Sequence, residues 1–166
     1  FTEPMIGAMA AAHDRPIVMP LSNPTDFSEA TPTNILNWSQ GRALISTGSP
    51  FDDVVYEGTR FEIGQANNVF IFPGVGLGAV VSQARQITSG MFLAASQALA
   101  EAVDDDRLRQ GGLFPPITEM RDVSIKVALA VIDAAVADGV AEPLIDPVAA
   151  MNRIAWEPFY LPYRPA

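Results

Sequence analysis

The stretch QANNVFIFPG, residues 65–74, places two asparagines directly ahead of an apolar run. Residues 69–72 predict a buried strand, because a short continuous apolar run bounded by turn-forming residues is typical of strands covered on both faces. Amides beside such a strand need hydrogen-bond partners, since burying an unpaired amide costs free energy. Asn67 and Asn68 are therefore candidates for contact with a ligand.

A second stretch of the same form lies nearer the start of the sequence. Residues 17–21 are apolar and lie between prolines, which predicts a short, fully buried strand. The strand is followed by Asn23, which the next residue, Pro24, restricts in conformation. Ligands of open α/β sheets bind beyond the carboxyl ends of the strands, so Asn23 is a third candidate.

The rest of the first hundred residues alternates helix and strand signals. Thr31 and Pro32 predict the start of a helix that stops at Gly41, and residues 43–47 predict the next strand. Residues 54–63 contain turn material around Gly58. Strands separated by helices indicate an α/β fold with a mostly parallel sheet.

Helical patterns replace the strands after residue 78. We expect helices over residues 79–86, 89–103, 115–139 and 147–156, separated by a polar break at 104–112. The tail, residues 157–165, is rich in proline and aromatic residues, so we expect it to wrap onto a surface of this chain or of a partner. The expected division is a sheet-containing part over 1–103 and a C-terminal helical segment over 104–166.

Composition limits the partners of the chain. A formal charge of -9, without a basic cluster, argues against nucleic acid and against anionic membranes. The most apolar region, residues 69–81, is interrupted by proline and glycine and is too short to span a membrane. The absence of cysteine fits a reducing compartment, and the cytoplasm is expected. The chain opens with Phe1 and looks cut from a longer protein.

The glycine-rich run GVGLGA, residues 74–79, fits the loose form of a dinucleotide fingerprint. The fingerprint needs a second strand ending in an acidic residue about 20 positions on, but that region predicts a helix. We therefore interpret these glycines as packing residues. The single histidine, His13, is expected at an exposed helix end, so neither a Ser-His-Asp relay nor a two-histidine metal site is expected within this chain. The runs at Asp52 and Asp104 are interpreted as solvated loops.

The three asparagines have a purely structural alternative. Asparagine often caps turns by bonding to nearby backbone groups, and an isolated asparagine would be interpreted in that way. The recurrence of the pattern at two strand ends makes a ligand contact an equal alternative, because an amide can hold a carboxylate, hydroxyl or carboxamide without adding charge.

At these residues the chain resembles the C-terminal part of the malic enzymes, and in particular their bacterial NAD-dependent branch. The similarity is carried by residues 15–25, 41–43 and 47–51 and by the stretch GQANNVFIFPGVGLG at 64–78, and it continues more weakly through 92–100 and 119–141. The resemblance implies the second half of a Rossmann-like cofactor-binding domain followed by a helical segment.

The resemblance also implies a function and a division of labour. Malic enzymes oxidatively decarboxylate malate to pyruvate and CO₂ with reduction of NAD, assisted by Mg²⁺ or Mn²⁺. The general acid, the general base, the metal ligands and the phosphate-binding loop would lie upstream, so no catalytic or metal-binding residue is assigned here and this chain alone is expected to be inactive. The substrate and nicotinamide contacts of the family match Asn23 and Asn67, with Asn68 beside Asn67.

Two alternatives stand beside this interpretation. A malolactic enzyme of the same family would release lactate instead of pyruvate, and a non-catalytic ligand-binding module could be built on half of such a domain. The choice between NAD and NADP is made where the adenosine ribose binds, in sequence outside this chain. A half sheet would expose a strand edge, so a homo-oligomer is expected.

Overall fold

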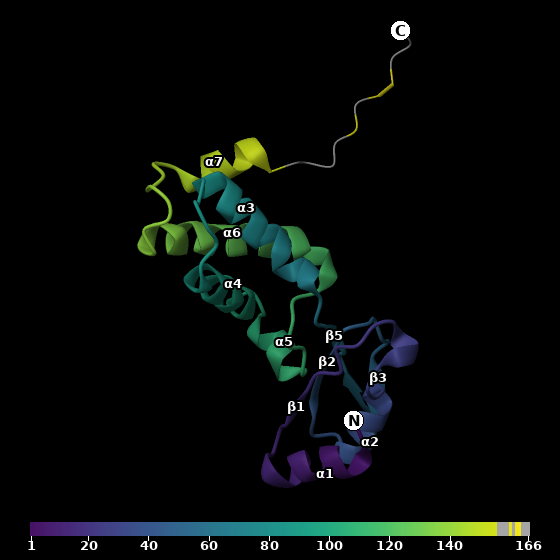
Figure 1. The fold of residues 1–166 in the computed structure, drawn as a ribbon. Coiled ribbons are helices and arrows are strands. Elements are labelled where there is room, and N and C mark those ends of the chain that lie inside the picture. The colour runs from purple at the N-terminus through teal and green to yellow at the C-terminus, as the bar shows by residue number, and fades with distance from the viewer. Residues whose placement is uncertain (156–159, 161, 164–166) are drawn as a thin grey trace.

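The computed structural model describes residues 1–155, 160, 162 and 163 (Figure 1). The elements in chain order are α1 (Glu3–Ala12), β1 (Ile17–Val18), η1 (Thr25–Phe27), α2 (Pro32–Ser39), β2 (Leu44–Thr47), β3 (Val54–Tyr56), β4 (Thr59–Phe61), β5 (Gly64–Gln65), η2 (Asn68–Phe70), α3 (Phe72–Ser82), α4 (Ser89–Glu101), α5 (Asp105–Arg109), η3 (Ile117–Glu119), α6 (Met120–Ala137) and α7 (Pro147–Ile154), where η marks a 3-10 helix.

A small parallel sheet confirms the predicted α/β class. Its strand order is β1-β2-β5, with Ile17 opposite Leu44 and Ser46 opposite Gly64. Residues from α1, α2 and the strands form one buried core, which includes Ile6, Ile35, Leu36, Val18 and Ile45. The prediction of a fully buried first strand is wrong in part, because β1 has two residues and the side chain of Ile17 is exposed at this edge of the sheet.

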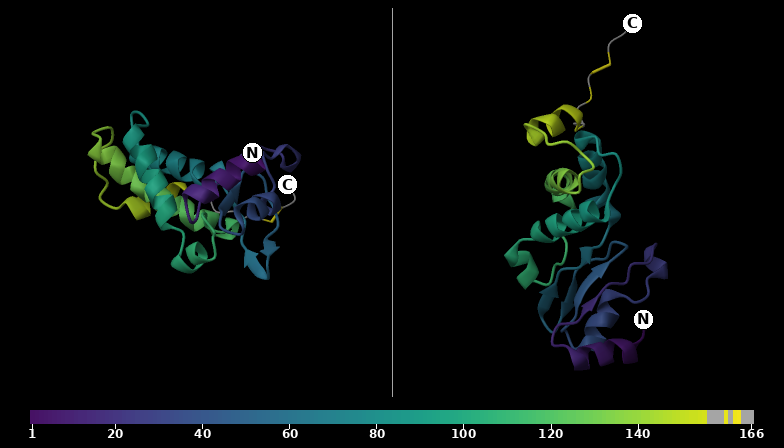
Figure 2. Two further views of the ribbon diagram at one scale, coloured as in Figure 1. Left: turned by 90° about the horizontal axis from the view of Figure 1, so that it is seen from below. Right: turned by 60° about the vertical axis from the view of Figure 1, so that its left-hand side comes forward.

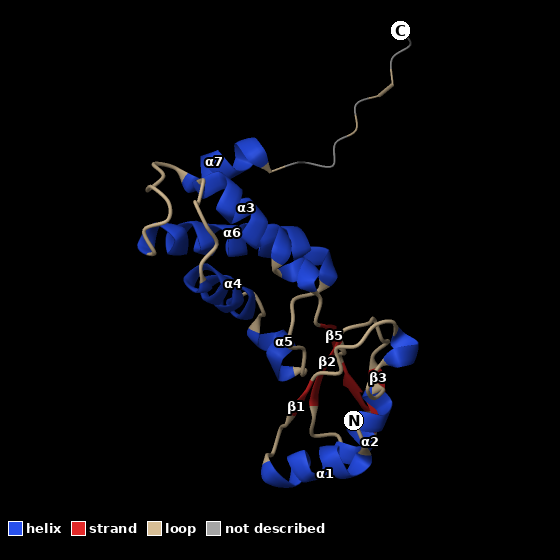
Figure 3. Cartoon of the chain, in the orientation of Figure 1, coloured by secondary structure: helices blue, strands red, loops and turns tan. Residues whose placement is uncertain are grey.

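The turn material around Gly58 forms an antiparallel hairpin of β3 and β4. Glu57 and Gly58 both have positive φ, as a two-residue hairpin turn with the favoured twist requires. The hairpin forms a second, two-stranded sheet next to the parallel one (Figure 3).

The predicted strand at residues 69–72 is wrong. The third strand is β5, and the apolar run after it forms η2 and the start of α3. Asn67 caps η2 and Pro73 lies in the first turn of α3, which are both signals of a helix start. The burial pattern is also one-sided, since Phe70 is buried while Phe72 is 59% exposed. Asn67 and Asn68 consequently follow a strand instead of preceding one.

The helices after β5 form a separate layer. Helices α3 and α4 pack against α6, and α7 lies on α3, so that in Figure 1 these helices gather at one end of the molecule and the parallel sheet with α1 and α2 at the other. The right-hand view of Figure 2 shows the same separation. The core of this helical layer contains Phe70, Val75, Met91, Val127 and Val131.

Most helix boundaries agree with the sequence signals. The hydroxyl of Thr31 accepts from the backbone N–H of Asn34 at the start of α2, and Thr88 caps α4 in the same way through Met91. The long helix begins at Met120, after η3, and the predicted polar break contains the short helix α5. Within the described part of the chain no helix has the length and apolar character needed to cross a membrane. The expected wrapping of the tail falls mostly on residues outside those described.

Candidate functional site

The carboxyl ends of the three parallel strands bring three loops to one edge of the sheet. The loop after β1 carries Asn23, the loop after β2 carries Ser49, and the segment after β5 carries Asn67 and Asn68. This edge is where open α/β sheets bind ligands. The corrected position of β5 therefore places all three predicted asparagines on the same edge.

Backbone hydrogen bonds hold these loops together. The N–H of Gly48 donates to the carbonyl of Pro20 at 2.9 Å, and the N–H of Ala66 donates to the carbonyl of Thr47 at 2.8 Å. The side-chain amide of Gln65 donates to the carbonyl of Gly48 at 3.1 Å. A Cβ atom at Gly48 would lie 2.1 Å from the carbonyl oxygen of Leu21, so only glycine permits this approach.

Asn23 is held through its side-chain oxygen. The hydroxyl of Ser49, which is only 2% exposed, lies 2.7 Å from Oδ1 of Asn23 and donates to it. The side-chain nitrogen of Asn23 has only a long contact of 3.4 Å, to the carbonyl of Leu21. The following peptide bond, to Pro24, is cis. Because the contact to Leu21 is long and Asn23 is exposed, the NH₂ group of Asn23 is available to donate to a ligand at this edge.

Asn67 shows the same division between its two polar atoms. Its Oδ1 accepts from the backbone N–H of Val69 at 3.0 Å, which fixes the orientation of the amide because a backbone N–H can only donate. Among the described residues its Nδ2 has no hydrogen-bond partner. The capping role and the ligand role thus use different atoms of one side chain.

Asn68 is exposed and contributes less to the geometry. Its backbone carbonyl accepts from the N–H of Ile71 at 3.0 Å inside η2, and no side-chain hydrogen bond of Asn68 occurs within the described part of the chain. Its amide is free to turn toward a ligand, but nothing holds it in one orientation.

Glu29 positions the loop that carries Asn23. Its Oε2 accepts from the backbone N–H of Ser22 at 3.1 Å. Hydrogen bonds from the backbone amides of Glu29 itself and of Ser22 lower the pKa of this carboxyl below its ordinary value. The charged form of Glu29 therefore stabilises the loop next to Asn23.

Ser49, Gln65 and Glu29 were missed as site residues by the sequence analysis. A signal existed for Ser49, because Gly48 and Ser49 follow a predicted strand just as Ser22 and Asn23 do. Glu29 carried no such signal, since it lies seven residues from its partner in an irregular segment.

The glycine-rich run lies inside α3 and packs against α6. A Cβ at Gly74 would lie 2.6 Å from Val127, and a Cβ at Gly78 would lie 2.7 Å from the carbonyl oxygen of Ala128. The interpretation as packing glycines is supported, but the close approach joins two helices and not a strand and a helix. The run therefore has the spacing of a dinucleotide fingerprint without its strand-to-helix turn.

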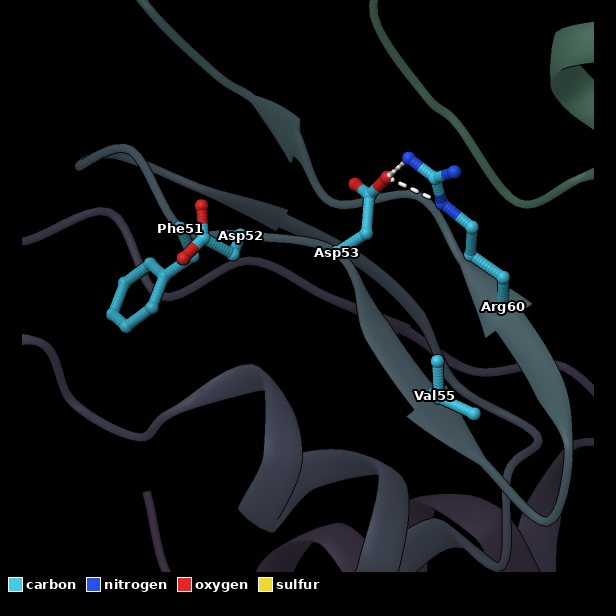
Figure 4. Close-up of a pocket in the computed structure, with 5 residues that line it drawn as sticks. All are labelled: Phe51, Asp52, Asp53, Val55 and Arg60. Atoms are coloured by element: carbon cyan, nitrogen blue, oxygen red, sulfur yellow. Dashed lines mark hydrogen bonds and ion pairs between the residues drawn. The ribbon is translucent and has the colours of Figure 1, made fainter.

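The acidic runs have structural partners. Asp53 binds the guanidinium of Arg60 across the hairpin, with Nε at 2.8 Å (Figure 4), and also accepts from the backbone N–H of Ile63. Asp104 caps α5 by accepting from the N–H of Arg107 at 2.7 Å. His13 lies exposed at the end of α1. No group of three or more metal-ligating side chains occurs among residues 1–155, 160, 162 and 163.

A parallel sheet that continues into helices, with amide donors gathered at its carboxyl edge, defines part of a Rossmann-like nucleotide-binding domain. Residues 1–136 match the family described as "Malic enzyme, NAD binding domain". The chain belongs to the malic enzyme family.

Individual relatives agree with this assignment. The chain is 43% identical over 166 residues to the NAD-dependent malic enzyme of Psychromonas ingrahamii, covering 99% of this chain and 30% of that protein. It is 44% identical to the chloroplastic NADP-dependent malic enzyme of Zea mays, covering 99% of this chain and 26% of that protein. The chain therefore spans less than a third of the length of these relatives.

A solved structure shows the same arrangement of elements. The malic enzyme of Entamoeba histolytica superimposes with a TM-score of 0.72 at 29% sequence identity, covering 93% of this chain and 28% of that one. The likeness confirms the expected fold class, the partial sheet of a Rossmann-like domain followed by helices.

Proposed function

We propose that this chain supplies the nicotinamide- and substrate-facing edge of an enzyme that oxidatively decarboxylates malate to pyruvate and CO₂ with reduction of NAD. The observation that carries the proposal is the state of two amides at the carboxyl edge of the sheet. Asn23 and Asn67 each have their oxygen bound to a protein donor, which leaves their NH₂ groups to donate. Oxygen atoms of carboxylates, hydroxyls and ribose are the acceptors that such donors bind.

The proposed roles are those of positioning. Asn67 donates to a carboxylate or hydroxyl oxygen of malate, and Asn23 donates to the nicotinamide ribose or to the substrate beside it. Asn68, next to Asn67, is proposed as a further contact. NAD, when bound, accepts the hydride from C2 of malate. Holding C2 of malate close to the nicotinamide ring would lower the activation free energy of hydride transfer. This role needs no proton transfer by a residue of this chain.

The described residues do not fit the Mg²⁺ or Mn²⁺ that the family resemblance implies. They contain no group of three metal-ligating side chains, and the carboxylates of Asp53, Asp104 and Asp106 bind protein donors instead. We therefore assign the metal, and the acid and base, to parts of the parent enzyme outside this chain.

The test is an assay of the protein in the length that its gene encodes, with malate, Mn²⁺ and either NAD or NADP. The expected result is metal-dependent nicotinamide reduction with pyruvate as product. Lactate without net nicotinamide reduction would establish the malolactic alternative, and no turnover would favour a ligand-binding module. Residues 1–166 alone are expected to give no turnover, and metal-dependent turnover by them would contradict the proposal.

The preference for NAD is a separate part of the proposal. Identity to the NADP-dependent maize enzyme, 44%, is close to the 43% identity to the NAD-dependent enzyme of Psychromonas ingrahamii, so the residues of this chain carry little of the discrimination between the two cofactors. Comparing kcat/KM for NAD and NADP in the same assay tests the preference. A higher value for NADP would overturn it.

Self-association is also proposed. β1 is an edge strand of the three-stranded sheet, and its Ile17 is 52% exposed. Such edges pair with other chains unless they are covered. Light scattering over a wide range of concentration is expected to show a dimer or larger species, and a monomer throughout would contradict the proposal. A cytoplasmic location remains a prediction from composition.

A further inference from the structure

A groove of about 450 Å³ lies at the opposite edge of the sheet from the asparagines. It is formed by four segments that are far apart in sequence: Arg15 just ahead of β1, residues 41–44 leading into β2, β4, and residues 109–111 at the end of α5. Four arginines line it, namely Arg15, Arg42, Arg60 and Arg109. The chain has only 10 lysines and arginines against 19 acidic residues, so this is a marked local concentration of positive charge.

Two of these arginines have no carboxylate partner. Arg15 is exposed and makes no ion pair or hydrogen bond with any residue that the structure describes. Arg42 donates through Nε to the carbonyl of Ser39 at 3.2 Å, and within the described residues its two terminal nitrogens are unbound. The neighbouring Asp14 does not line the groove and forms no ion pair in the described part of the chain.

The other two arginines are in exposed ion pairs. Arg60 binds Asp53 across the hairpin and is 76% exposed (Figure 4), and Arg109 binds Asp106 one turn away in α5 and is 69% exposed. Ion pairs at such exposure contribute little net stability. Both guanidinium groups can therefore exchange a carboxylate of the protein for an anion in the groove at small cost.

The walls of the groove are held in place. Arg107 binds Glu62, which follows β4, and also donates to the carbonyl of Phe114, so α5 is fixed against the hairpin. The side chain of Arg107 is only 13% exposed. At the other wall, Gly41 has a φ of +70°, and a Cβ there would lie 2.8 Å from the ring of Tyr56. The arginines thus stand on elements whose relative positions are fixed.

We propose that this groove binds a small organic molecule with two or more anionic oxygen groups, either phosphates or carboxylates. The planar guanidinium of arginine binds both groups through paired N–H donors. Leu44 and Phe61 provide an apolar surface beside the charges, which suits a carbon framework between the anionic groups. The site is separate from the proposed nicotinamide edge, because the strands that carry Arg15 and Arg42 at their amino ends carry Asn23 and Ser49 beyond their carboxyl ends.

Calorimetric titration with pyrophosphate and, separately, with succinate tests this proposal. The protein is used in the length that its gene encodes, without divalent metal, with saturating NAD and at a fixed ionic strength of about 0.15 M, where long-range attraction is screened. Saturable binding of at least one probe at millimolar concentration or below is expected. The tighter of the two identifies phosphate or carboxylate as the preferred group, and no saturable binding of either would overturn the proposal.

Two variants test whether the probe binds in the groove. Arg15→Gln removes an unpaired charge without breaking a contact and is expected to weaken binding at least fivefold. Arg42→Lys keeps the charge but removes the planar group, and a similar loss is expected. The matched control is Arg153→Gln, an exposed arginine in α7, with a change below twofold. Equal weakening by Arg15→Gln and Arg153→Gln would show attraction to overall charge only and would overturn the proposal.

Discussion

The hydroxyl of Ser49 donates a 2.7 Å hydrogen bond to the side-chain oxygen of Asn23 and thereby joins the loop after β2 to the loop after β1. The bond decides which half of the Asn23 amide faces outward. Because the oxygen is bound, a ligand at this edge meets the NH₂ group and must offer an acceptor. The chemistry of the edge is therefore set by a residue that itself need not touch the ligand.

Replacing Ser49 with alanine releases the Asn23 amide. The loss of one such hydrogen bond costs about 0.5–1.5 kcal/mol, so we expect kcat/KM for malate in the gene-length protein to fall by about 2- to 10-fold. Ser96→Ala is the matched control, because the Ser96 hydroxyl donates to the carbonyl of Phe92 within α4, far from this edge. Equal kcat/KM values for the two variants would contradict the proposed role of Ser49 in positioning Asn23.

Asn67→Asp separates the two roles of Asn67. A carboxylate still accepts from the N–H of Val69, so the melting temperature is expected to stay close to that of the unchanged protein. The variant lacks the NH₂ donor and adds a negative charge at the proposed malate contact, so kcat/KM for malate is expected to fall at least about tenfold. Asn34→Asp on the exposed face of α2 is the control. A kcat/KM for malate in Asn67→Asp equal to that of the unchanged protein would show that Asn67 acts only as a helix cap.

Glu29→Gln tests the pH dependence of the loop next to Asn23. The lowered pKa means that the charged carboxyl stabilises the folded state fully at pH values above its ordinary 4.5 and loses this effect as the pH falls through the lower folded pKa. The unchanged protein is therefore expected to be more stable than Glu29→Gln at pH 7, with the difference shrinking as the pH falls below 4.5 toward the lower folded pKa. Urea unfolding at pH 7 and pH 3 measures it, and a difference that grows in acid would have the wrong sign.

Two glycines of α3 are expected to respond in opposite directions to alanine. A Cβ at Gly78 would meet the backbone of Ala128, so Gly78→Ala is expected to lower the free energy of unfolding by about 1–3 kcal/mol. Gly76 has no atom within 4 Å of such a Cβ, so Gly76→Ala is expected to raise it by about 0.5–1 kcal/mol through helix propensity. Urea unfolding of both variants measures the two free energies. Equal changes in the free energy of unfolding would mean that α3 does not approach α6 as described.

Thr47 is fully buried at the end of β2, and its hydroxyl has no hydrogen-bond partner among the described residues. An unsatisfied buried hydroxyl is destabilising, so Thr47→Val is expected to leave the free energy of unfolding unchanged or to raise it by up to about 1 kcal/mol. Thermal unfolding measures the effect. A clear loss of stability would show that the hydroxyl has a partner in solution.

The sequence predicted well those features that depend on neighbouring residues. Thr31 before a proline and Thr88 before an amphipathic run identify helix starts through local capping, and both helices were found where expected. The strand at 69–72 was wrong because an apolar run does not distinguish a buried strand from a buried helix start. Asparagine at 67 and proline at 73 are the local signals that distinguish the helix start from a strand here.

The site was predicted only as far as single residues allow. The sequence identified Asn23, Asn67 and Asn68 one by one, but the bond from Ser49 to Asn23 and the bond from Ser22 to Glu29 join residues that are 26 and 7 positions apart. Contacts of this kind depend on the register of the sheet and on the path of irregular segments. Neither quantity leaves a periodic pattern in the sequence.

The separation of the sheet core from the helical core has a consequence for how the molecule opens. The side chains that stabilise α6 are shared with α3 and α4, whereas those that stabilise β2 are shared with α1 and α2. Cooperative unfolding units follow such shared contacts, so native-state hydrogen exchange is expected to give two distinct opening free energies, one for amides of α6 and one for amides of β2. Asn23, which Ser49 holds beyond β2, would then persist through fluctuations that melt the helical layer, whereas Asn67, the cap of η2, would lose its support with that layer.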